Sequence, residues 1–160
     1  MNDIERLVAK DKIKTQLARY CKGIDTRDWA MVRSCFGEGH QHKHGPFEGT
    51  LDEFVGFASN SLSKIEVSQH SLSNFIITIG DDGLTAKSDV NFTAVHLISA
   101  SITEDLTFNI VGEDTDWTVL GNYADEWVCR DGEWLIVKRV AGQHWQRVEL
   151  SKKRPIKKGA

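Results

Sequence analysis

The sequence predicts an α+β fold, in which N-terminal helices pack on one face of a strongly curved, mainly antiparallel sheet. Apolar residues first recur every three or four positions, which is the helical period. From about residue 65 the pattern changes to β-rich stretches separated by short turns. Helices followed by a meander of strands are typical of α+β proteins. Because the chain has 160 residues, no internal repeat and no linker, we expect residues 1–150 to form one domain.

Three helices are expected in the first part of the chain. The first ends by Asp25, since Gly23 weakens its last turn. Its apolar stripe consists of Ile4, Leu7, Val8, Ile13, Leu17, Tyr20, Cys21 and Ile24. A short second helix follows, with Thr26 or Asp28 as its N-cap and Trp29, Val32, Cys35 and Phe36 on its inner face. After the turn at residues 45–49, Thr50 and Glu53 form a predicted capping box, which opens a third helix. The inner face of that helix carries Phe54, Phe57, Ala58 and Leu62.

The second part of the chain is expected to form strands. Residues 71–79 are β-rich and end at a Gly-Asp-Asp-Gly turn, and residues 84–102 form a long second strand. Residues 106–130 are expected to give one or two strands around a loop at 113–116. The turn at 130–132 then leads into a last hairpin strand at 133–142. A sheet curved around a helical layer encloses an apolar cavity, where small molecules bind.

Composition excludes several classes of protein. The chain has no apolar run of the roughly 18 residues needed to span a membrane, and its charged N-terminus is unlike a signal peptide. We therefore expect a cytoplasmic protein without membrane contact, in which Cys21, Cys35 and Cys129 are reduced and mostly buried. The tail at 151–160 is basic, but the net charge is −3 and the body is acidic. This balance favours a solvated or subunit-docking tail over nucleic-acid binding.

Five polar residues are candidates for chemistry. Each also has a structural explanation. Asp25 lies where the helix dipole disfavours a carboxylate, so it either has a cationic partner or caps the second helix. His70 and His96 lie in predicted strands, and a histidine in a strand is commonly a core or rim residue. By alternation, His96 lies on the same side of its strand as Val90, Phe92 and Ala94. Tyr20 also fits a core position. Arg139, on the same side as Leu135 and Val137 by alternation, also fits a surface charge.

The order of several motifs resembles the SnoaL-like families of the nuclear-transport-factor-2-like superfamily. These motifs are Tyr20 followed by Asp25-Thr-Arg-Asp-Trp, then Gly-Pro-Phe-Glu-Gly at 45–49, His70-Ser-Leu-Ser-Asn74, and Arg-Asp-Gly-Glu-Trp at 130–134 followed by Lys138-Arg139. The resemblance covers roughly residues 5 to 145 and implies a cystatin-like α+β cone. Within the superfamily, the pattern is most similar to the branch of hexachlorocyclohexane dehydrochlorinase, scytalone dehydratase and bile acid 7α-dehydratase.

The resemblance implies roles for individual residues. His70 would be the general base that removes a proton from carbon, and Asp25 would orient it. Arg139 would stabilise the developing or departing anion. Tyr20, His96 and Asn74 would contact the substrate. His42 is a further candidate for substrate contact, from its place on a strand at the expected cavity mouth and not from the resemblance. The dehydrochlorinase has a lysine where this chain has Tyr20, which favours a hydroxyl leaving group or another substrate over a halide.

The implied function is a cofactor-independent lyase (a dehydratase or another eliminating enzyme) or an isomerase, acting on a small hydrophobic or cyclic substrate in a homo-oligomer, a trimer or dimer. A non-catalytic module of the same fold that binds a small ligand or dimerises is the alternative. Trp117, Trp127, Trp134 and Trp145 are compatible with either oligomer.

The segment Gly-His-Gln-His-Lys-His-Gly at 39–45 suggests a metal site. On one strand, however, His40, His42 and His44 would span about 13 Å, whereas zinc needs each nitrogen within about 2.1 Å. One strand therefore cannot supply all three ligands, although two neighbours could chelate with a third ligand from elsewhere. A solvated strand face is the favoured interpretation. The other alternative is that His42 or His44 contacts a ligand at the cavity mouth. No metal is expected.

Overall fold

The computed structural model describes residues 1–152, so most of the predicted basic tail lies outside the described residues. Three helices and six strands follow one another along the chain. Their bounds are α1 Asp3–Thr26, α2 Trp29–Ser34, β1 Phe36–His44, β2 Phe47–Gly49, α3 Leu51–Leu62, β3 Val67–Ile79, β4 Thr85–Ile98, β5 Thr115–Arg130 and β6 Glu133–Leu150.

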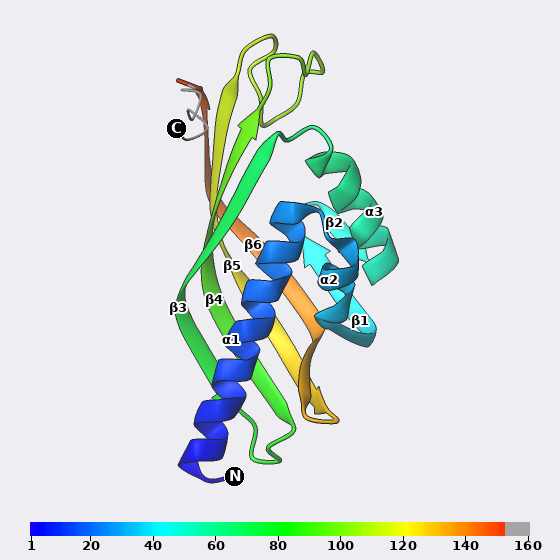
Figure 1. Cartoon of the computed structure of the whole chain (residues 1–160), viewed down its shortest axis with the longest axis vertical. Helices are drawn as coiled ribbons and strands as arrows, with labels where there is room; N and C mark the ends of the chain where they lie inside the picture. Colours follow the sequence, from blue (N-terminus) through cyan, green and yellow to red (C-terminus); the bar gives the residue numbers. More distant parts are fainter. Residues whose placement is uncertain (153–160) are drawn as a thin grey trace, which may run out of the picture.

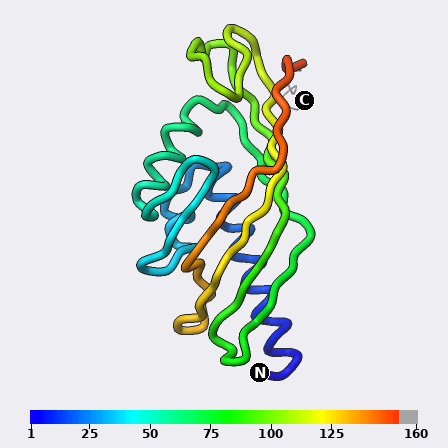
Figure 2. The backbone as a smooth tube through the Cα atoms, turned by 180° about the vertical axis from the view of Figure 1, so that it is seen from behind, coloured from blue at the N-terminus to red at the C-terminus, as the bar shows by residue number. Residues whose placement is uncertain are grey.

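The six strands form one mixed sheet in the order β2-β1-β6-β5-β4-β3. Neighbouring strands are antiparallel except for β1 and β6, which pair in parallel. All three helices lie on the same face of this curved sheet, and no helix of the described residues lies on the opposite face (Figures 1 and 2). The sheet does not close into a barrel, because β2 and β3 remain at its edges. The predicted α+β class, with helices on one face of a mainly antiparallel sheet, is confirmed.

Helix α1 lies lengthwise along the sheet, but only part of its predicted apolar stripe is buried. Ile13 and Leu17 are fully buried in the core, whereas Ile4, Leu7 and Val8 are at least half exposed. Within residues 1–152, the first turns of α1 therefore carry an apolar stripe that no other element covers. The helix ends where Arg27 adopts the left-handed conformation, and Asp28 then caps α2 by accepting a hydrogen bond from the Met31 amide.

Helix α3 begins as the sequence predicts. The Thr50 hydroxyl accepts from the Glu53 amide, and the Glu53 carboxylate accepts from the Thr50 amide, so that both halves of the capping box are present. Phe54 is buried against β1, while Phe57 is 38% exposed. Among residues 1–152, no helix is long and apolar enough to cross a membrane. Cys21 and Cys35 are buried, and all three cysteines are free.

The connection between β4 and β5 differs from the prediction. Residues 106–110 form part of a long loop instead of a strand. The Asn109 side chain accepts a hydrogen bond from the Leu106 amide and donates to the Glu104 carbonyl, which satisfies local backbone groups without a partner strand. The Phe108 ring stacks on Trp117 of β5 at 4.8 Å. This loop therefore folds back over the inner face of the sheet.

Candidate active site

A cavity of about 220 Å³ lies between α1, α3, the inner face of the sheet and the β4–β5 loop. Its wall is mainly apolar, with aromatic rings from Phe54, Phe92, Phe108 and Trp117. The polar residues on the wall are Tyr20, His44, Ser61, His70, His96, Thr107, Gln143 and Gln146. No Asp, Glu, Lys or Arg belongs to the described part of the wall. A cavity of this kind suits a compact, uncharged and largely apolar molecule.

Asp25 and His70 meet at the margin of this cavity. The Nδ1 atom of His70 lies 2.7 Å from Oδ1 of Asp25, and the His70 backbone amide donates to Oδ2 at 2.9 Å. The Ser68 hydroxyl donates to Oδ1 at 3.1 Å. This arrangement is possible because β3 is an edge strand, so its outward amide is not used by another strand. Asp25 therefore holds both the backbone and the ring of His70.

The Asp25 carboxylate is ionised at neutral pH. Partial burial opposes ionisation, but the hydrogen bonds from the His70 ring and amide and from Ser68 hold the pKa of Asp25 below its usual value. An ionised carboxylate only accepts hydrogen bonds, so the proton between the two residues belongs to Nδ1 of His70. The Nε2 atom is then the nitrogen with a free lone pair. Asp25 does not cap α2, since Asp28 does.

His96 lies next to His70 on the inner face of β4, with the two rings edge to face at 5.7 Å. Its Nδ1 atom donates to the Trp117 carbonyl at 3.2 Å, and its ring stacks on the indole at 4.5 Å. Burial and the charge of nearby His70 lower the pKa of His96 to about 4. His96 is therefore neutral at pH 7, and its Nε2 can accept a hydrogen bond from a bound molecule.

The structure places Arg139 beneath the cavity wall, where it does not line the cavity. Its guanidinium forms two hydrogen bonds of 2.7 Å to Asp125, and both side chains are fully buried. It also packs 4.1 Å from the ring centre of Tyr20 and 4.2 Å from that of Tyr123. Alternation had placed Arg139 with Leu135 and Val137. A bulge opposite residues 126–127 reverses the phase, so Arg139 faces inward with Ile136.

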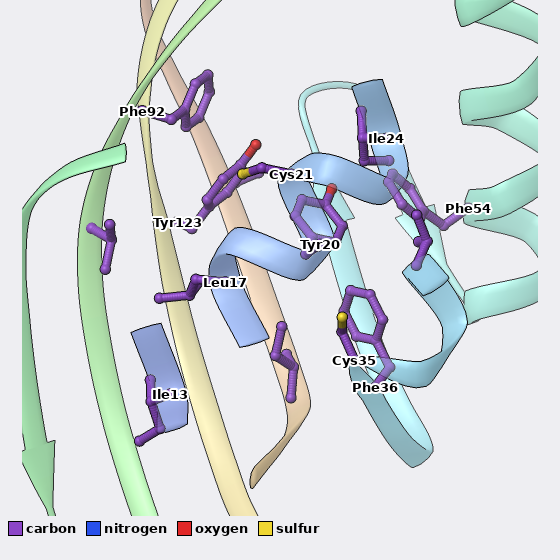
Figure 3. Packing of buried hydrophobic residues seen from close by; sticks show 14 of the residues in the cluster. Ile13, Leu17, Tyr20, Cys21, Ile24, Cys35, Phe36, Phe54, Phe92 and Tyr123 are labelled. Atoms are coloured by element: carbon purple, nitrogen blue, oxygen red, sulfur yellow. The ribbon is translucent and has the colours of Figure 1, made fainter. Parts of the chain in front are cut away.

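Tyr20 joins Arg139 to the cavity. It lines the cavity, and Figure 3 shows its ring beside that of Tyr123 among the buried side chains. Burial raises the pKa of Tyr20 above its ordinary value, although the Arg139 charge opposes the shift. The hydroxyl of Tyr20 is therefore protonated and able to donate a hydrogen bond.

The structure does not bring Asn74 into the cavity. A register shift between Ser73 and Ile76 interrupts the β3–β4 ladder, and Asn74 has a left-handed backbone with φ of 51°. This bulge turns Asn74 to the exposed surface. The expected contact between Asn74 and a substrate is therefore not supported by its position.

The histidine segment is not the solvated strand face that the sequence favoured. His40 and His42 are buried, 6% and 1% exposed, and the His42 ring stacks on Phe54 at 3.7 Å. The three side chains do share one face of β1, but this face points toward α3. His44 lines the cavity and His42 does not, so the expected substrate contact of His42 falls instead on His44, two residues along the strand. Within residues 1–152, no group of three or more His, Cys, Asp or Glu side chains is placed to hold a metal ion.

The family of the protein follows from a match to the SnoaL-like domain over residues 5–140. The chain belongs to the SnoaL-like domain family. No curated protein matches it.

Solved structures share the fold of this SnoaL-like chain at low identity. A candidate scytalone dehydratase from Novosphingobium aromaticivorans is 18% identical, with a TM-score of 0.76 and 99% coverage of both chains. A type 2 hexachlorocyclohexane dehydrochlorinase is 14% identical, with a TM-score of 0.77 and coverage of 99% of this chain and 100% of the other. A protein of unknown function with a cystatin-like fold, from Nostoc punctiforme, is 17% identical, with a TM-score of 0.65 and coverage of 90% and 94%.

Several residues around this SnoaL-like cavity were missed by sequence reasoning. Thr107 and Phe108 come from a loop that the sequence predicts as a strand, and no periodicity marks a loop as a cavity wall. Gln143 and Gln146 lie beyond the expected end of β6. Asp125 could have been noticed, because it is an acidic residue at a buried position of an otherwise apolar strand face.

Proposed function

We propose that the protein is a cofactor-independent lyase or isomerase, which removes a proton from a carbon atom of a small, uncharged ring compound. The observation that carries the proposal is the 2.7 Å hydrogen bond between His70 and Asp25 at the margin of an apolar cavity. A histidine held by a carboxylate in its Nδ1–H form offers Nε2 as a general base. The fold shared with a dehydrochlorinase and a candidate scytalone dehydratase supports the same class of reaction.

In the elimination, Nε2 of His70 takes a proton from the substrate carbon. The electron pair of that C–H bond forms the double bond, and the bond from the neighbouring carbon to its hydroxyl group breaks. The departing oxygen accepts a hydrogen bond from the Tyr20 hydroxyl, whose electrostatic environment is set by Arg139 at 4.1 Å from the ring. The proton held on His70 then leaves with the hydroxide as water. Asp25 stabilises the imidazolium in between.

The experiment compares elimination by wild type, His70→Ala and Asp25→Asn on a panel of hydroxylated and halogenated cyclic compounds, with product formation followed by mass spectrometry. His70→Ala should lower turnover about 100- to 10,000-fold, as expected for loss of a general base. Asp25→Asn should lower it less and change its pH profile, because the amide alters the tautomer of His70. The exposed residue His144 provides the control variant His144→Ala, which should retain full turnover.

Unchanged turnover in His70→Ala would refute the assignment of the base. A wild type that binds members of the panel in the cavity, but converts none of them, would support a non-catalytic binding module instead.

A further inference from the structure

His44 is the polar residue of the cavity whose surroundings are unexplained by the proposed chemistry. It occupies the last position of β1, where its backbone pairs with Phe47 and Ala141, and its side chain reaches the cavity wall. Its Nδ1 atom is buried and, among residues 1–152, has no hydrogen-bond partner. A buried polar atom without a partner is costly, and native structures rarely keep one without a reason.

Three other polar side chains of the cavity wall differ from His44 in this respect. His70 is bonded to Asp25 through Nδ1, and His96 to the Trp117 carbonyl. Gln146 accepts a hydrogen bond of 3.1 Å from the Trp117 indole. Each of these side chains is held in place by a protein partner. Within residues 1–152, the His44 ring is held by stacking contacts, and its Nδ1 atom has no hydrogen-bond partner.

Stacking fixes the direction of the His44 ring. Its plane lies within 11° of the His42 ring and within 25° of the Phe54 ring, at centroid distances of 5.9 and 5.7 Å. His42 is itself sandwiched against Phe54 and lies 3.4 Å from Nε2 of His40 through its Nδ1 atom. The buried row of histidines therefore acts as a support that presents His44 in one orientation, which lowers the entropy cost of binding.

The position of His44 relative to His70 follows from the sheet order. His44 lies on β1 and His70 on β3, and three strands separate these two elements. Both side chains line the cavity, each from its own strand. Burial and the charges of Arg139 and His70 lower the pKa of His44 to about 4. A neutral imidazole has one donor and one acceptor, and a hydroxyl group can pair with either.

We propose that His44 is a substrate-binding residue, whose imidazole hydrogen-bonds to a hydroxyl group of the bound ring compound at the wall of the cavity. This inference deepens the proposed lyase function and rests on it, since it gives the same substrate a second point of attachment. The substrate is then held at one end by His44 while its reacting carbon faces His70.

The test uses a matched pair of probes, 2-naphthol and naphthalene, which differ by a single hydroxyl group. Binding to wild type, His44→Phe and His144→Phe is measured by calorimetry. Replacement by Phe keeps a planar ring on Phe54 and removes both nitrogens. We expect 2-naphthol to bind His44→Phe about three- to tenfold more weakly than wild type, as for loss of one hydrogen bond. Naphthalene should bind both equally, and His144→Phe should change neither affinity.

A second measurement does not depend on any variant folding correctly. In the nitrogen-15 NMR spectrum of wild-type protein, the imidazole signals of His44 should shift on addition of 2-naphthol and remain in place with naphthalene. Equal affinity of 2-naphthol for wild type and His44→Phe, or bound 2-naphthol with unmoved His44 signals, would overturn the proposal. Failure of 2-naphthol to bind wild type would overturn it as well. The lyase function fails separately, if His70→Ala keeps full turnover while the His44 contact is observed.

Discussion

The buried pair of Asp125 and Arg139 allows a stability prediction that does not require a known substrate. Asp125→Asn keeps the shape of the side chain but removes its charge. Wild-type Asp125 accepts two hydrogen bonds of 2.7 Å, and neither side chain of the pair is exposed. The variant therefore leaves a guanidinium fully buried without a counter-charge. Loss of one partner from a buried pair costs about 3–5 kcal/mol, which is a large part of the roughly 5–15 kcal/mol typical of a domain.

The neighbouring pair on the same two strands is a matched control. Lys138 and Glu126 also face each other across β5 and β6, at 3.5 Å, but their side chains are 47% and 48% exposed. Glu126→Gln should therefore cost no more than about 1 kcal/mol. Urea unfolding followed by tryptophan fluorescence measures both. The double variant Asp125→Leu with Arg139→Met should recover most of the loss, since an apolar pair has no buried charge to compensate.

The result that refutes this reasoning is an Asp125→Asn protein as stable as Glu126→Gln. In that case the buried guanidinium of Arg139 would not need the negative charge of Asp125 to be stable beside Tyr20. A low stability of Asp125→Asn that the double variant fails to restore would show that removing the buried charge is not enough to recover the loss.

Two further predictions concern stability. A Cβ at Gly121 would lie 2.0 Å from the Gly142 carbonyl oxygen. Gly121→Ala should therefore lower the free energy of unfolding, measured in urea, by more than about 3 kcal/mol. Gly56 lies on the exposed face of α3 with no atom near an added methyl group, so Gly56→Ala should raise the free energy of unfolding by about 0.5–1 kcal/mol. His96 has a folded-state pKa of about 4, below its unfolded value, so between pH 6.5 and 4 the unfolded chain binds the extra proton. The contribution of neutral His96 to the free energy of unfolding is therefore present above pH 6.5 and is lost on acidification, by up to about 3 kcal/mol. His96→Phe removes this titration and should flatten the measured dependence of the free energy of unfolding on pH. Equal stabilities of the two glycine variants, or an unchanged pH slope in His96→Phe, would contradict these arguments.

The sequence predicts the fold well because the relevant signals are local. The capping box at Thr50, the turn at residues 130–132 and the alternation around His96 each depend on residues within a few positions of one another. The inner position of His96 and the start of α3 are confirmed for this reason. The exposed N-terminal stripe of α1 shows the limit, because periodicity reveals a face but does not reveal what covers it.

The site is predicted less completely, because bulges change the strand register. Counted from the turn at residues 130–132, Asp125 would face Lys138. The bulge opposite residues 126–127 shifts the pairing by one, so that Asp125 meets Arg139. A similar shift in β3 carries Asn74 to the surface. The contact of Asp25 with His70, in contrast, joins a helix end to a strand edge before the bulge in β3, and the structure brings the two residues together.

The way in which Asp25 is bound has a consequence for its role. It accepts hydrogen bonds from the ring and from the backbone amide of the same residue, His70, while Arg27 next to it donates to the Ile65 carbonyl at 2.8 Å. The end of α1 is thus attached to the edge of the sheet at the same point where the His70 ring is oriented. A shift of the helix would move the carboxylate and the histidine together. The geometry of the pair is therefore maintained by the fold itself, which gives a physical reason for an acidic residue at the end of a helix whose dipole disfavours it.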